Sequence, residues 1–330
     1  MNEMARPEFS LITLSYQSGT HLSDCLEALT GLGDNNEYLH ADNGSDDISL
    51  ADLKARFPGV IQIANPENLG FAAGMNQAAA RARGTWLGFI NPDAFVDRNW
   101  LKAMQRAIED HPDTAIFTSL QLDSQVPDHM DGAGDAMTFF GFPYRSGFGQ
   151  NLPETLKTSE VFGPCGAAFL IRRDLFLALD GFDESFFCYC EDADLAFRAR
   201  LLGARTLFIP QAIVHHVGSA SSGKRSDFAL WHGYRNRIWL YIKNMPALLL
   251  VVSAPFHFAM TLFGALKDTF KGKGHIVGSA LLAALLGIKP MLLQRKIIQS
   301  RRQISALRLA KSLTWNPLKI ARRDLDHRRP

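Results

Sequence analysis

The chain has few cysteines, and their spacing excludes two kinds of scaffold. Only four are present among 330 residues, at positions 25, 165, 188 and 190. This spacing matches neither a zinc-binding pattern nor a disulfide framework. Free thiols, as in the cytosol, are therefore expected. The first eight residues lack the apolar segment of a secretory signal peptide, and the sequence has no internal repeat or long low-complexity segment.

Two common nucleotide-binding fingerprints are also missing. Residues 68–76 contain glycines at positions 70 and 74, but they match neither G-x-G-x-x-G nor the Gly-Lys-Ser/Thr of a P-loop. A dinucleotide-dependent dehydrogenase and a P-loop NTPase are therefore not expected. A glycine at a helix start still allows a phosphate to approach the backbone closely. Gly74 is equally consistent with close packing of a helix on a sheet.

The net charge of the chain is small, but its charged residues are unevenly distributed. The net charge is +2, yet residues 295–330 contain eleven Lys or Arg and two Asp, which leaves the first 294 residues at −7. A hydrophobic content of 47% with 21% charged residues is typical of a folded protein with a substantial core. A basic tail on an acidic body predicts an anionic surface partner, either a membrane or a nucleic acid.

Short apolar runs alternate with helical patterns along most of the chain. This alternation predicts an α/β fold with a parallel, doubly wound sheet. The segment 123–152, rich in Gly, Asp and aromatic residues, is too long for a plain connection and predicts a functional loop or small hairpin. Strands are expected at residues 9–16, 38–41, 60–64, 86–90, 115–122, 161–171, 206–209 and 212–214, and helices at 21–32, 50–57 and 172–179, with an Ala-rich helix ending near 83.

Two aspartates directly follow predicted strands. Asp42 comes after the second strand and Asp93 after the strand at 86–90. Ligands of doubly wound sheets bind at the carboxyl ends of the strands. Each aspartate alone is equally explained as a solvated turn residue. Two such strand ends with a glycine-containing loop between them favour a binding site.

An acidic stretch stands at the start of a later helical pattern. Glu191, Asp192 and Asp194 follow the largely apolar run 186–190. Acidic residues at a helix start are stabilised by the helix dipole, so a capped helix is one interpretation. A carboxylate next to an apolar run also has the setting in which its pKa rises towards that of a useful base. The stretch alone leaves these two interpretations equally open.

In combination, these motifs resemble those of the family 2 inverting glycosyltransferases, which have the GT-A fold. The resemblance covers residues 8–245 and implies a mixed, doubly wound sheet, followed here by C-terminal apolar or amphipathic helices. The segment Asp131-Gly132-Ala133-Gly134-Asp135, with Arg235-Asn236, is most similar to the rhamnosyltransferase-like branch. The matching motifs, in order, are Asp42-Asn43-Gly44-Ser45, Asn68-Leu69-Gly70-Phe71, Asn91-Pro92-Asp93, Gly166-Ala167-Ala168, Glu191-Asp192-Ala193-Asp194 and His216.

The resemblance implies a role for each matching position. Asp192 matches the general base, which removes the acceptor hydroxyl proton on the face opposite the leaving diphosphate. Asp93 and His216 match ligands of a divalent metal, Mg²⁺ or Mn²⁺, although Asn91 replaces the first acid of the family's D-x-D element. His215 would face the other side of its strand. The donor-nucleotide positions are Ser15, Asp42, Asn68, Gly70 and Asn76, and the positions that support the acceptor or the helix start are Gly166, Glu191, Asp194 and Arg235.

The last third of the chain contains long apolar runs. Residues 231–245 mix aromatic and cationic side chains, which is typical of either a nucleic-acid surface or a membrane interface. Residues 247–266 are nearly uncharged and close to the roughly 20 residues of a bilayer span, but Pro255 and His257 argue against a simple span. Residues 276–293 are a second apolar stretch, interrupted by Lys289 and Pro290. Buried core helices remain an alternative for both.

We therefore predict a catalytic domain at 1–245 and a membrane-associating helical region with a basic tail at 246–330. The helices would lie in the cytoplasmic leaflet of the inner membrane, without a nucleic-acid partner. By resemblance, the enzyme would move a sugar such as rhamnose from a nucleotide-diphosphate donor to a glycan or polyprenyl-linked acceptor in envelope polysaccharide synthesis. Two alternatives stay open: a catalytically inactive sugar- or partner-binding protein of this fold, and a nucleotidyltransferase, although residues 16–20 lack the cation that it would need.

Overall fold

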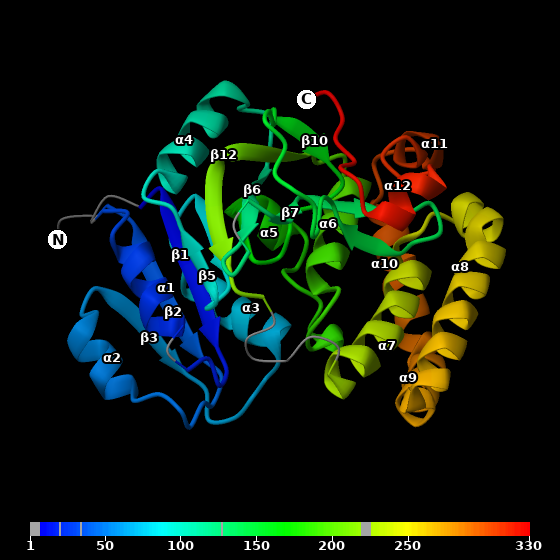
Figure 1. Cartoon of the computed structure of the whole chain (residues 1–330), viewed down its shortest axis with the longest axis horizontal. Coiled ribbons are helices and arrows are strands. Elements are labelled where there is room, and N and C mark those ends of the chain that lie inside the picture. The colour runs from blue at the N-terminus through cyan, green and yellow to red at the C-terminus, as the bar shows by residue number, and fades with distance from the viewer. Residues whose placement is uncertain (1–6, 20, 34, 127, 219–225) are drawn as a thin grey trace.

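A ten-stranded mixed sheet forms the centre of the molecule (Figure 1). The computed structural model describes residues 7–330 except 20, 34, 127 and 219–225. The order along the sheet is β10-β12-β6-β11-β4-β1-β2-β3, with β5 paired to β12 and β7 to β6. The strands are β1 (Phe9–Ser15), β2 (Glu37–Asp42), β3 (Val60–Ala64), β4 (Trp86–Ile90), β5 (Ala94–Val96), β6 (Ile116–Asp123), β7 (Met130–Ala133), β10 (Ser159–Val161), β11 (Ala168–Arg172) and β12 (Thr206–His216).

The sheet is parallel on one side and mixed on the other. Strands β3, β2, β1 and β4 run parallel, whereas β11 is antiparallel to both β4 and β6. All seven residues of β1 are buried, as expected for a strand covered on both faces. The mixed, doubly wound sheet implied by the family resemblance is thus confirmed. The parallel sheet predicted from the alternation of strands and helices is wrong for β5, β7, β10 and β11, which pair antiparallel.

Helices cover both faces of the sheet and bury apolar side chains against it. One core layer joins the sheet to α1 (His21–Thr30), α2 (Leu50–Arg56) and α4 (Trp100–Asp110). The other joins it to α3 (Phe71–Arg81), α5 (Arg173–Ala178) and α6 (Glu191–Leu201). In α4, for example, Trp100, Leu101, Met104 and Ala107 are buried, which is the spacing of a single helix face.

Three predicted elements differ in the structure. The strand expected at 161–171 is two strands, β10 and β11, because the chain leaves the sheet around Gly163, Pro164 and Gly166. The strands expected at 206–209 and 212–214 are one strand, β12, with a register shift between Ile209 and Ile213. Pro210 lies in this shift and has no N–H to donate to the ladder.

The segment 123–152 contains β7 and a hairpin of β8 (Asp135–Met137) and β9 (Pro143–Arg145), so the hairpin prediction is confirmed.

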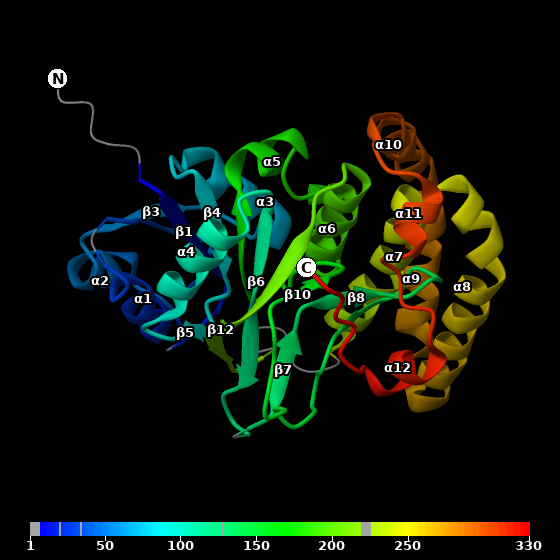
Figure 2. The same ribbon diagram turned by 90° about the horizontal axis from the view of Figure 1, so that it is seen from above.

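The C-terminal helices pack as a layer against one end of the sheet domain (Figure 2). Their core continues into that of the sheet domain, since Phe186 and Phe197 share a cluster with Trp239, Ala284 and Leu309. The boundary predicted at 245/246 therefore falls inside a continuous core. The helices are α7 (Asp227–Asn244), α8 (Ala247–Asp268), the π-helical turn η2 (Thr269–Lys273), α9 (Gly274–Leu286), α10 (Ile288–Arg301), α11 (Ala306–Ala310) and α12 (Pro317–Arg322).

The basic C-terminal tail is folded back onto the protein. Arg328 pairs with Asp326, and its backbone bridges to Glu160 of β10. Arg295 donates to the carbonyls of Ile242 and Met245 at the end of α7. Several of the tail's cations are thus engaged within the protein.

Candidate active site

The end of β2 carries the predicted nucleotide-binding aspartate. Both carboxylate oxygens of Asp42 lie 3.3 Å from the backbone N–H of Ser45, and the residue is buried. The Ser15 hydroxyl donates to Asp42 at 3.1 Å and lies 2.8 Å from Nε2 of His40. Ser15 is completely buried, and its side chain orients Asp42. Burial lowers the pKa of His40 to about 4, which keeps this imidazole neutral.

Asn43 joins this strand end to the glycine-containing loop. Its side-chain amide donates to Oδ1 of Asn68 at 3.0 Å and to the carbonyl of Gly70 at 3.1 Å. Gly70 has a φ of 84° and precedes α3, and a Cβ there would lie 2.5 Å from the ring of Phe187. The loop is therefore fixed on one side by Asn43 and on the other by Phe187. Sequence reasoning gave Asn43 no role, although it stands in the quoted motif.

Asp93 and His216 lie side by side because β5 pairs with the end of β12. Ala94 faces His216 in this pairing, and Nε2 of His216 is 3.3 Å from Oδ1 of Asp93. His215 is exposed and His216 buried, as strand alternation predicts. Nδ1 of His216 lies 2.7 Å from Oδ2 of Asp131, a residue that sequence reasoning did not assign to the site. Burial opposes protonation of His216, but its hydrogen bonds to Asp131 and Asp93 outweigh this and raise its pKa to about 9.

This arrangement fits a metal site completed from outside the protein. No group of three His, Cys, Asp or Glu side chains among the described residues is placed to hold a metal ion by itself. When a metal displaces the proton of Nε2 while Nδ1 donates to Asp131, the lone pair of Nε2 is directed at the same space as Asp93, as in carboxylate–histidine–metal sites. Asn91 adds a buried Oδ1 without a hydrogen-bond partner in the described structure.

Asp192 lies at the first turn of α6, next to Gly166. A Cβ at Gly166 would lie 2.4 Å from Oδ2 of Asp192, so only glycine allows this approach. Asp192 is partly exposed, whereas the flanking residues Glu191 and Ala193 are buried. Burial raises the pKa of Asp192, while the N–H of Ala193 and the charge of Arg145 oppose this rise. A carboxylate that is reachable and has a raised pKa is suited to accept a proton.

The two neighbouring acids have different surroundings. Oε2 of Glu191 is buried without a hydrogen-bond partner in the described structure, and burial raises its pKa well above the ordinary value. Asp194 is completely buried and accepts hydrogen bonds from Arg198 at 2.6 Å and Asn244 at 2.7 Å. Asp194 therefore holds α6 against α7 and does not face a ligand.

A second cluster of charged groups lies beside Asp192 and was missed in the sequence. Arg145 on β9 pairs with Asp131, and Cys165 donates to Oδ1 of Asp135 at 3.2 Å. Burial and the charge of Asp192 raise the pKa of Asp135 to about 8. Arg145 pairs with Asp131 and its charge also acts on Asp192, whose pKa it lowers. The Asp-Gly-Ala-Gly-Asp motif contains both acids of this cluster, but only the hairpin fold brings Arg145 to them.

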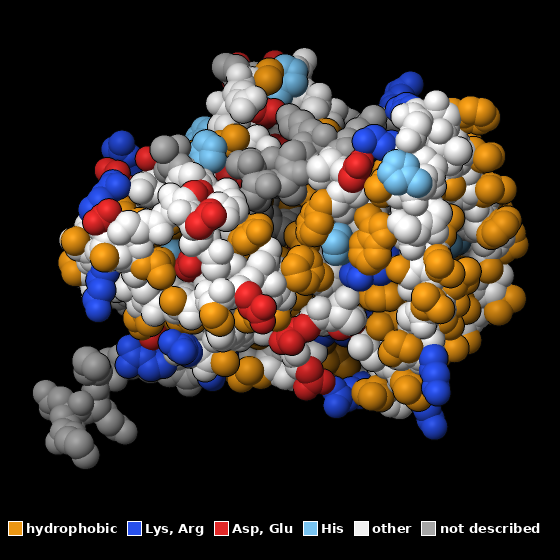
Figure 3. Space-filling model, turned by 90° about the horizontal axis from the view of Figure 1, so that it is seen from below, with side chains coloured by type: hydrophobic (Ala, Val, Ile, Leu, Met, Phe, Trp, Pro, Cys, Tyr) orange, Lys and Arg blue, Asp and Glu red, His pale blue; other side chains and the backbone are white. Residues whose placement is uncertain are grey.

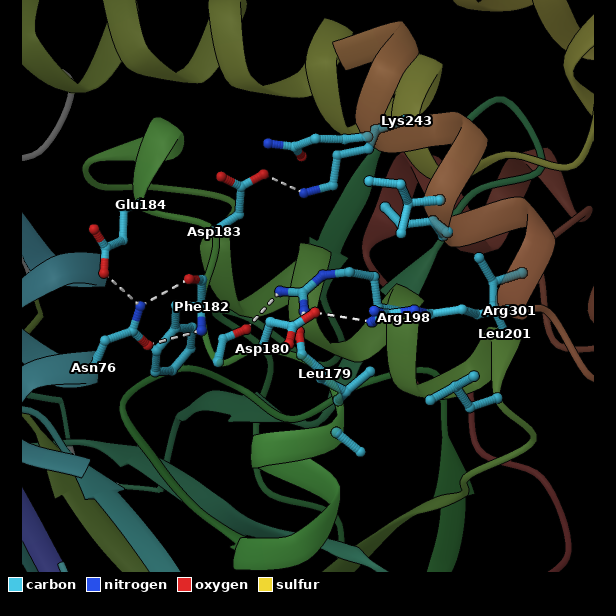
Figure 4. A pocket seen from close by; sticks show the side chains of 16 residues that line it. Asn76, Leu179, Asp180, Phe182, Asp183, Glu184, Arg198, Leu201, Lys243 and Arg301 are labelled. Carbon is cyan, nitrogen blue, oxygen red and sulfur yellow. Dashed lines mark hydrogen bonds and ion pairs between the residues drawn. The ribbon is translucent and has the colours of Figure 1, made fainter. Parts of the chain in front are cut away.

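Two of the predicted site residues hold a loop instead of facing the site. Asn76 bonds both backbone groups of Phe182 and the carboxylate of Glu184 (Figure 4). Arg235 donates to the carbonyls of Ser185 and Phe186 and stacks between two tryptophans of α7. Both residues thus fix the segment between α5 and α6.

A cavity of about 320 Å³ lies behind this segment (Figure 4). It is lined by parts of α6 and α10, and by the loop at 178–184, but by none of Asp42, Asp93, Asp192 or His216. Charged side chains that line the cavity form ion pairs, for example Lys243 with Asp183. The cavity therefore belongs to the support of the site and not to the candidate catalytic groups.

These residues define a group-transfer site on a mixed α/β sheet. The site combines strand-end acids, a carboxylate–histidine pair and a separate, partly exposed carboxylate. The sequence model of glycosyl transferase family 2 matches residues 10–179, more than half of the chain. The protein belongs to this family and is a glycosyltransferase. It is also 28% identical over 241 residues to N-acetylglucosaminyl-diphospho-decaprenol L-rhamnosyltransferase of Mycobacterium tuberculosis, which covers 65% of this chain and 77% of that protein.

Solved structures show the same fold at low sequence identity. The S. aureus TarS 1–349 complex with UDP-GlcNAc has a TM-score of 0.55 and 15% identity, covering 94% of this chain and 93% of that one. The mannosyltransferase PcManGT from Pyrobaculum calidifontis, in complex with GDP-Man and Mn²⁺, also has a TM-score of 0.55 and 15% identity, covering 90% and 85%. These similarities confirm the GT-A fold expected from the sequence.

Proposed function

We propose that the protein is an inverting glycosyltransferase that moves rhamnose from a nucleotide-diphosphate donor to a polyprenyl-linked or glycan acceptor. The observation that carries this proposal is the chain of contacts from Asp93 through His216 and Asp131 to Arg145, beside Asp192. This cluster supports a site for the diphosphate next to a base for the acceptor. The choice of sugar and acceptor rests on the similarity to the mycobacterial rhamnosyltransferase, and envelope polysaccharide synthesis is the context that we propose.

Asp192 would act as the general base. Its carboxylate takes the proton of the acceptor hydroxyl, whose oxygen then attacks the anomeric carbon on the face opposite the diphosphate. The glycosidic bond forms as the bond to the diphosphate breaks, so the anomeric configuration inverts. Arg145, close to both Asp131 and Asp192, favours the charged form of the base before the transfer.

Asp93 and His216 would hold a divalent metal such as Mg²⁺ or Mn²⁺, with further ligands from the donor diphosphate and water. When bound, the metal would neutralise the charge that develops on the leaving diphosphate. Asp131 would fix the tautomer and orientation of His216. Asp42 and the loop 68–70 would contact the nucleotide, since they lie at the carboxyl ends of neighbouring parallel strands.

We further propose that the protein docks on the cytoplasmic leaflet of the inner membrane through α8 and α9. Within the described residues, the stretch 247–286, which contains α8 and α9, is long and apolar enough to cross a membrane, and only 17% of its most apolar part is buried. Gly272, with a φ of 80°, turns the chain back so that the two helices form a hairpin, which favours a docked over a spanning arrangement. Figure 3 shows apolar side chains gathered on this side of the molecule. They include Leu248, Val251, Val252, Phe256, Phe258, Leu262, Phe263, Leu266, Phe270, Leu282, Leu285 and Leu286.

Transfer assays with a panel of nucleotide sugars test the chemistry. We expect transfer from dTDP-rhamnose, dependence on Mn²⁺ or Mg²⁺, and a product of inverted configuration. Asp192→Asn should lower kcat by about 10²–10⁴-fold while donor binding and thermal stability stay close to wild type. Wild-type turnover in a folded Asp192→Asn variant would exclude this residue as the base. No turnover of any donor would favour the inactive binding protein, and pyrophosphate exchange would favour the nucleotidyltransferase.

Vesicle flotation tests the docking surface. The wild-type protein should float with vesicles that contain phosphatidylglycerol, and a variant with Phe258→Asp and Phe263→Asp should not. Both side chains are more than 60% exposed, so folding should be preserved. Leu177→Asp on α5 is the control, since this exposed residue lies away from the hairpin. Flotation of the double variant at the wild-type level would contradict the proposal.

A further inference from the structure

The segment that leads into Asp192 has an unusual backbone. Phe187, Tyr189 and Cys190 have φ values of 64°, 69° and 67°, in the left-handed region that non-glycine residues seldom adopt. Three such residues within four positions cost free energy, which the surrounding structure must offset. Because α6 begins at Glu191, the shape of this segment decides where the carboxylate of Asp192 lies.

One helix, α7, holds this segment from end to end. Nδ2 of Asn236 lies 3.0, 2.9 and 2.7 Å from the carbonyl oxygens of Phe186, Cys188 and Tyr189. Asn236 is completely buried. Arg235 donates to the carbonyl of Phe186 at 2.9 Å and, through Nε, to Oδ1 of Asn236 at 2.8 Å. The two side chains therefore bind the carbonyl groups that directly precede the three left-handed residues.

The residues on either side of the segment are held by the same helix. Lys243 pairs with Asp183, which precedes the segment (Figure 4). It also lies 2.8 Å from Oδ1 of Asp194, in the first turn of α6. Arg235 itself is fixed between the rings of Trp231 and Trp239, at 4.6 and 4.4 Å. The indole N–H of Trp239 donates to the carbonyl of Ala284 on α9, so the hairpin of α8 and α9 supports this arrangement.

The segment also contacts the loop proposed to bind the donor. The carbonyl of Phe187 accepts from the N–H of Ala72 at 3.2 Å, and its ring packs against Gly70. The position of Phe187 therefore sets both the approach to Asp192 and one wall of the donor loop.

We propose that Asn236 and Arg235 are positioning residues that hold the strained segment 187–190 and thereby place the base Asp192 against the donor loop. This inference rests on the proposed function, in which Asp192 is the base. Neither residue touches the reacting atoms. Their effect on turnover passes through the backbone that they bind.

A double-mutant cycle with Asp192→Asn tests the proposal. Asn236→Ala should lower kcat by about 10²-fold, as expected when a catalytic group is displaced by about 1 Å. In the Asp192→Asn background the same change should alter the residual rate by no more than about twofold. A general structural defect would instead lower both backgrounds by the same factor, and that result would overturn the proposal. If Asp192→Asn alone keeps wild-type turnover, the proposed base is wrong, which is a separate outcome.

Two further variants keep the test decisive. Arg235→Ala removes a half-buried side chain, so it should fold even if Asn236→Ala does not. It should lower kcat by at least about tenfold, the equivalent of one charged hydrogen bond, and this loss should also vanish in the Asp192→Asn background. Gln299→Ala is the matched control, because Gln299 donates to the carbonyl of Asn244 on α7 but does not contact the segment. It should keep wild-type kcat. Equal losses in the control and the test variants, or failure of both test variants to fold, would show that α7 has a structural role only.

Discussion

The ion pair between Lys243 and Asp183 offers a quantitative test of how the site is supported. Lys243 is 1% exposed and also lies 2.8 Å from the buried Asp194. Lys243→Met keeps much of the side chain's volume but removes the charge. Breaking a buried pair by removing one partner costs about 3–5 kcal/mol, because the remaining charge is left uncompensated. We expect the lower end of that range, since Asp194 retains Arg198 and Asn244.

The assay is thermal unfolding, compared with an exposed ion pair in the same protein. Lys273 and Asp227 lie 2.6 Å apart but are 44% and 50% exposed. Lys273→Met should therefore cost about 0–1 kcal/mol. With about 2–4 °C lost per kcal/mol in domains of this order of size, Lys243→Met should lower Tm by roughly 5–10 °C and Lys273→Met by much less.

The pH dependence gives an independent check of the same pair. Burial opposes ionisation of Asp183, but Lys243 and Ser185 outweigh it, so the pKa of Asp183 is lowered on folding. The pair therefore stabilises the protein above the unfolded-state pKa of Asp183, and this contribution is lost as the pH falls through its folded-state pKa. The stability difference between wild type and Lys243→Met should narrow in acid. Equal effects of Lys243→Met and Lys273→Met at neutral pH would refute the reasoning.

Three further predictions concern the site itself. His216→Ala should raise the Mn²⁺ concentration for half-maximal transfer by at least about tenfold, and an unchanged metal requirement would exclude it as a ligand. Arg145→Gln removes a charge that lowers the pKa of Asp192, so the acid limb of log kcat/KM against pH should move to higher pH; a shift to lower pH would contradict this. Gly70→Ala puts a Cβ 2.5 Å from Phe187 at a φ of 84°, so donor KM should rise and Tm should fall, whereas unchanged values would show that the loop can relax.

The local residue pattern was enough to predict most of the sheet. Buried strands such as β1 and β4 are short, largely apolar runs, and helices such as α1 show one apolar stripe, so both follow from the local pattern and its length. Strand β5 and helix α4 were not predicted from the sequence. The errors in the elements that were predicted fall where the backbone leaves regular geometry. Pro210 causes a register shift within β12, and the chain around Gly163 and Pro164 leaves the sheet, although neighbouring residues still have strand-like composition.

The sequence by itself determined the fold class, the family and the acids at the strand ends, because these depend on residue type and on order along the chain. The tertiary structure decided which residues meet. Asp131 orients His216, Arg145 lies near Asp192, and Asn236 holds the backbone before α6, each across a sequence separation that no local pattern encodes. Such contacts depend on strand pairing and helix packing, so residues with equal local composition, such as Asp192 and Asp194, acquire different surroundings only when the chain is folded.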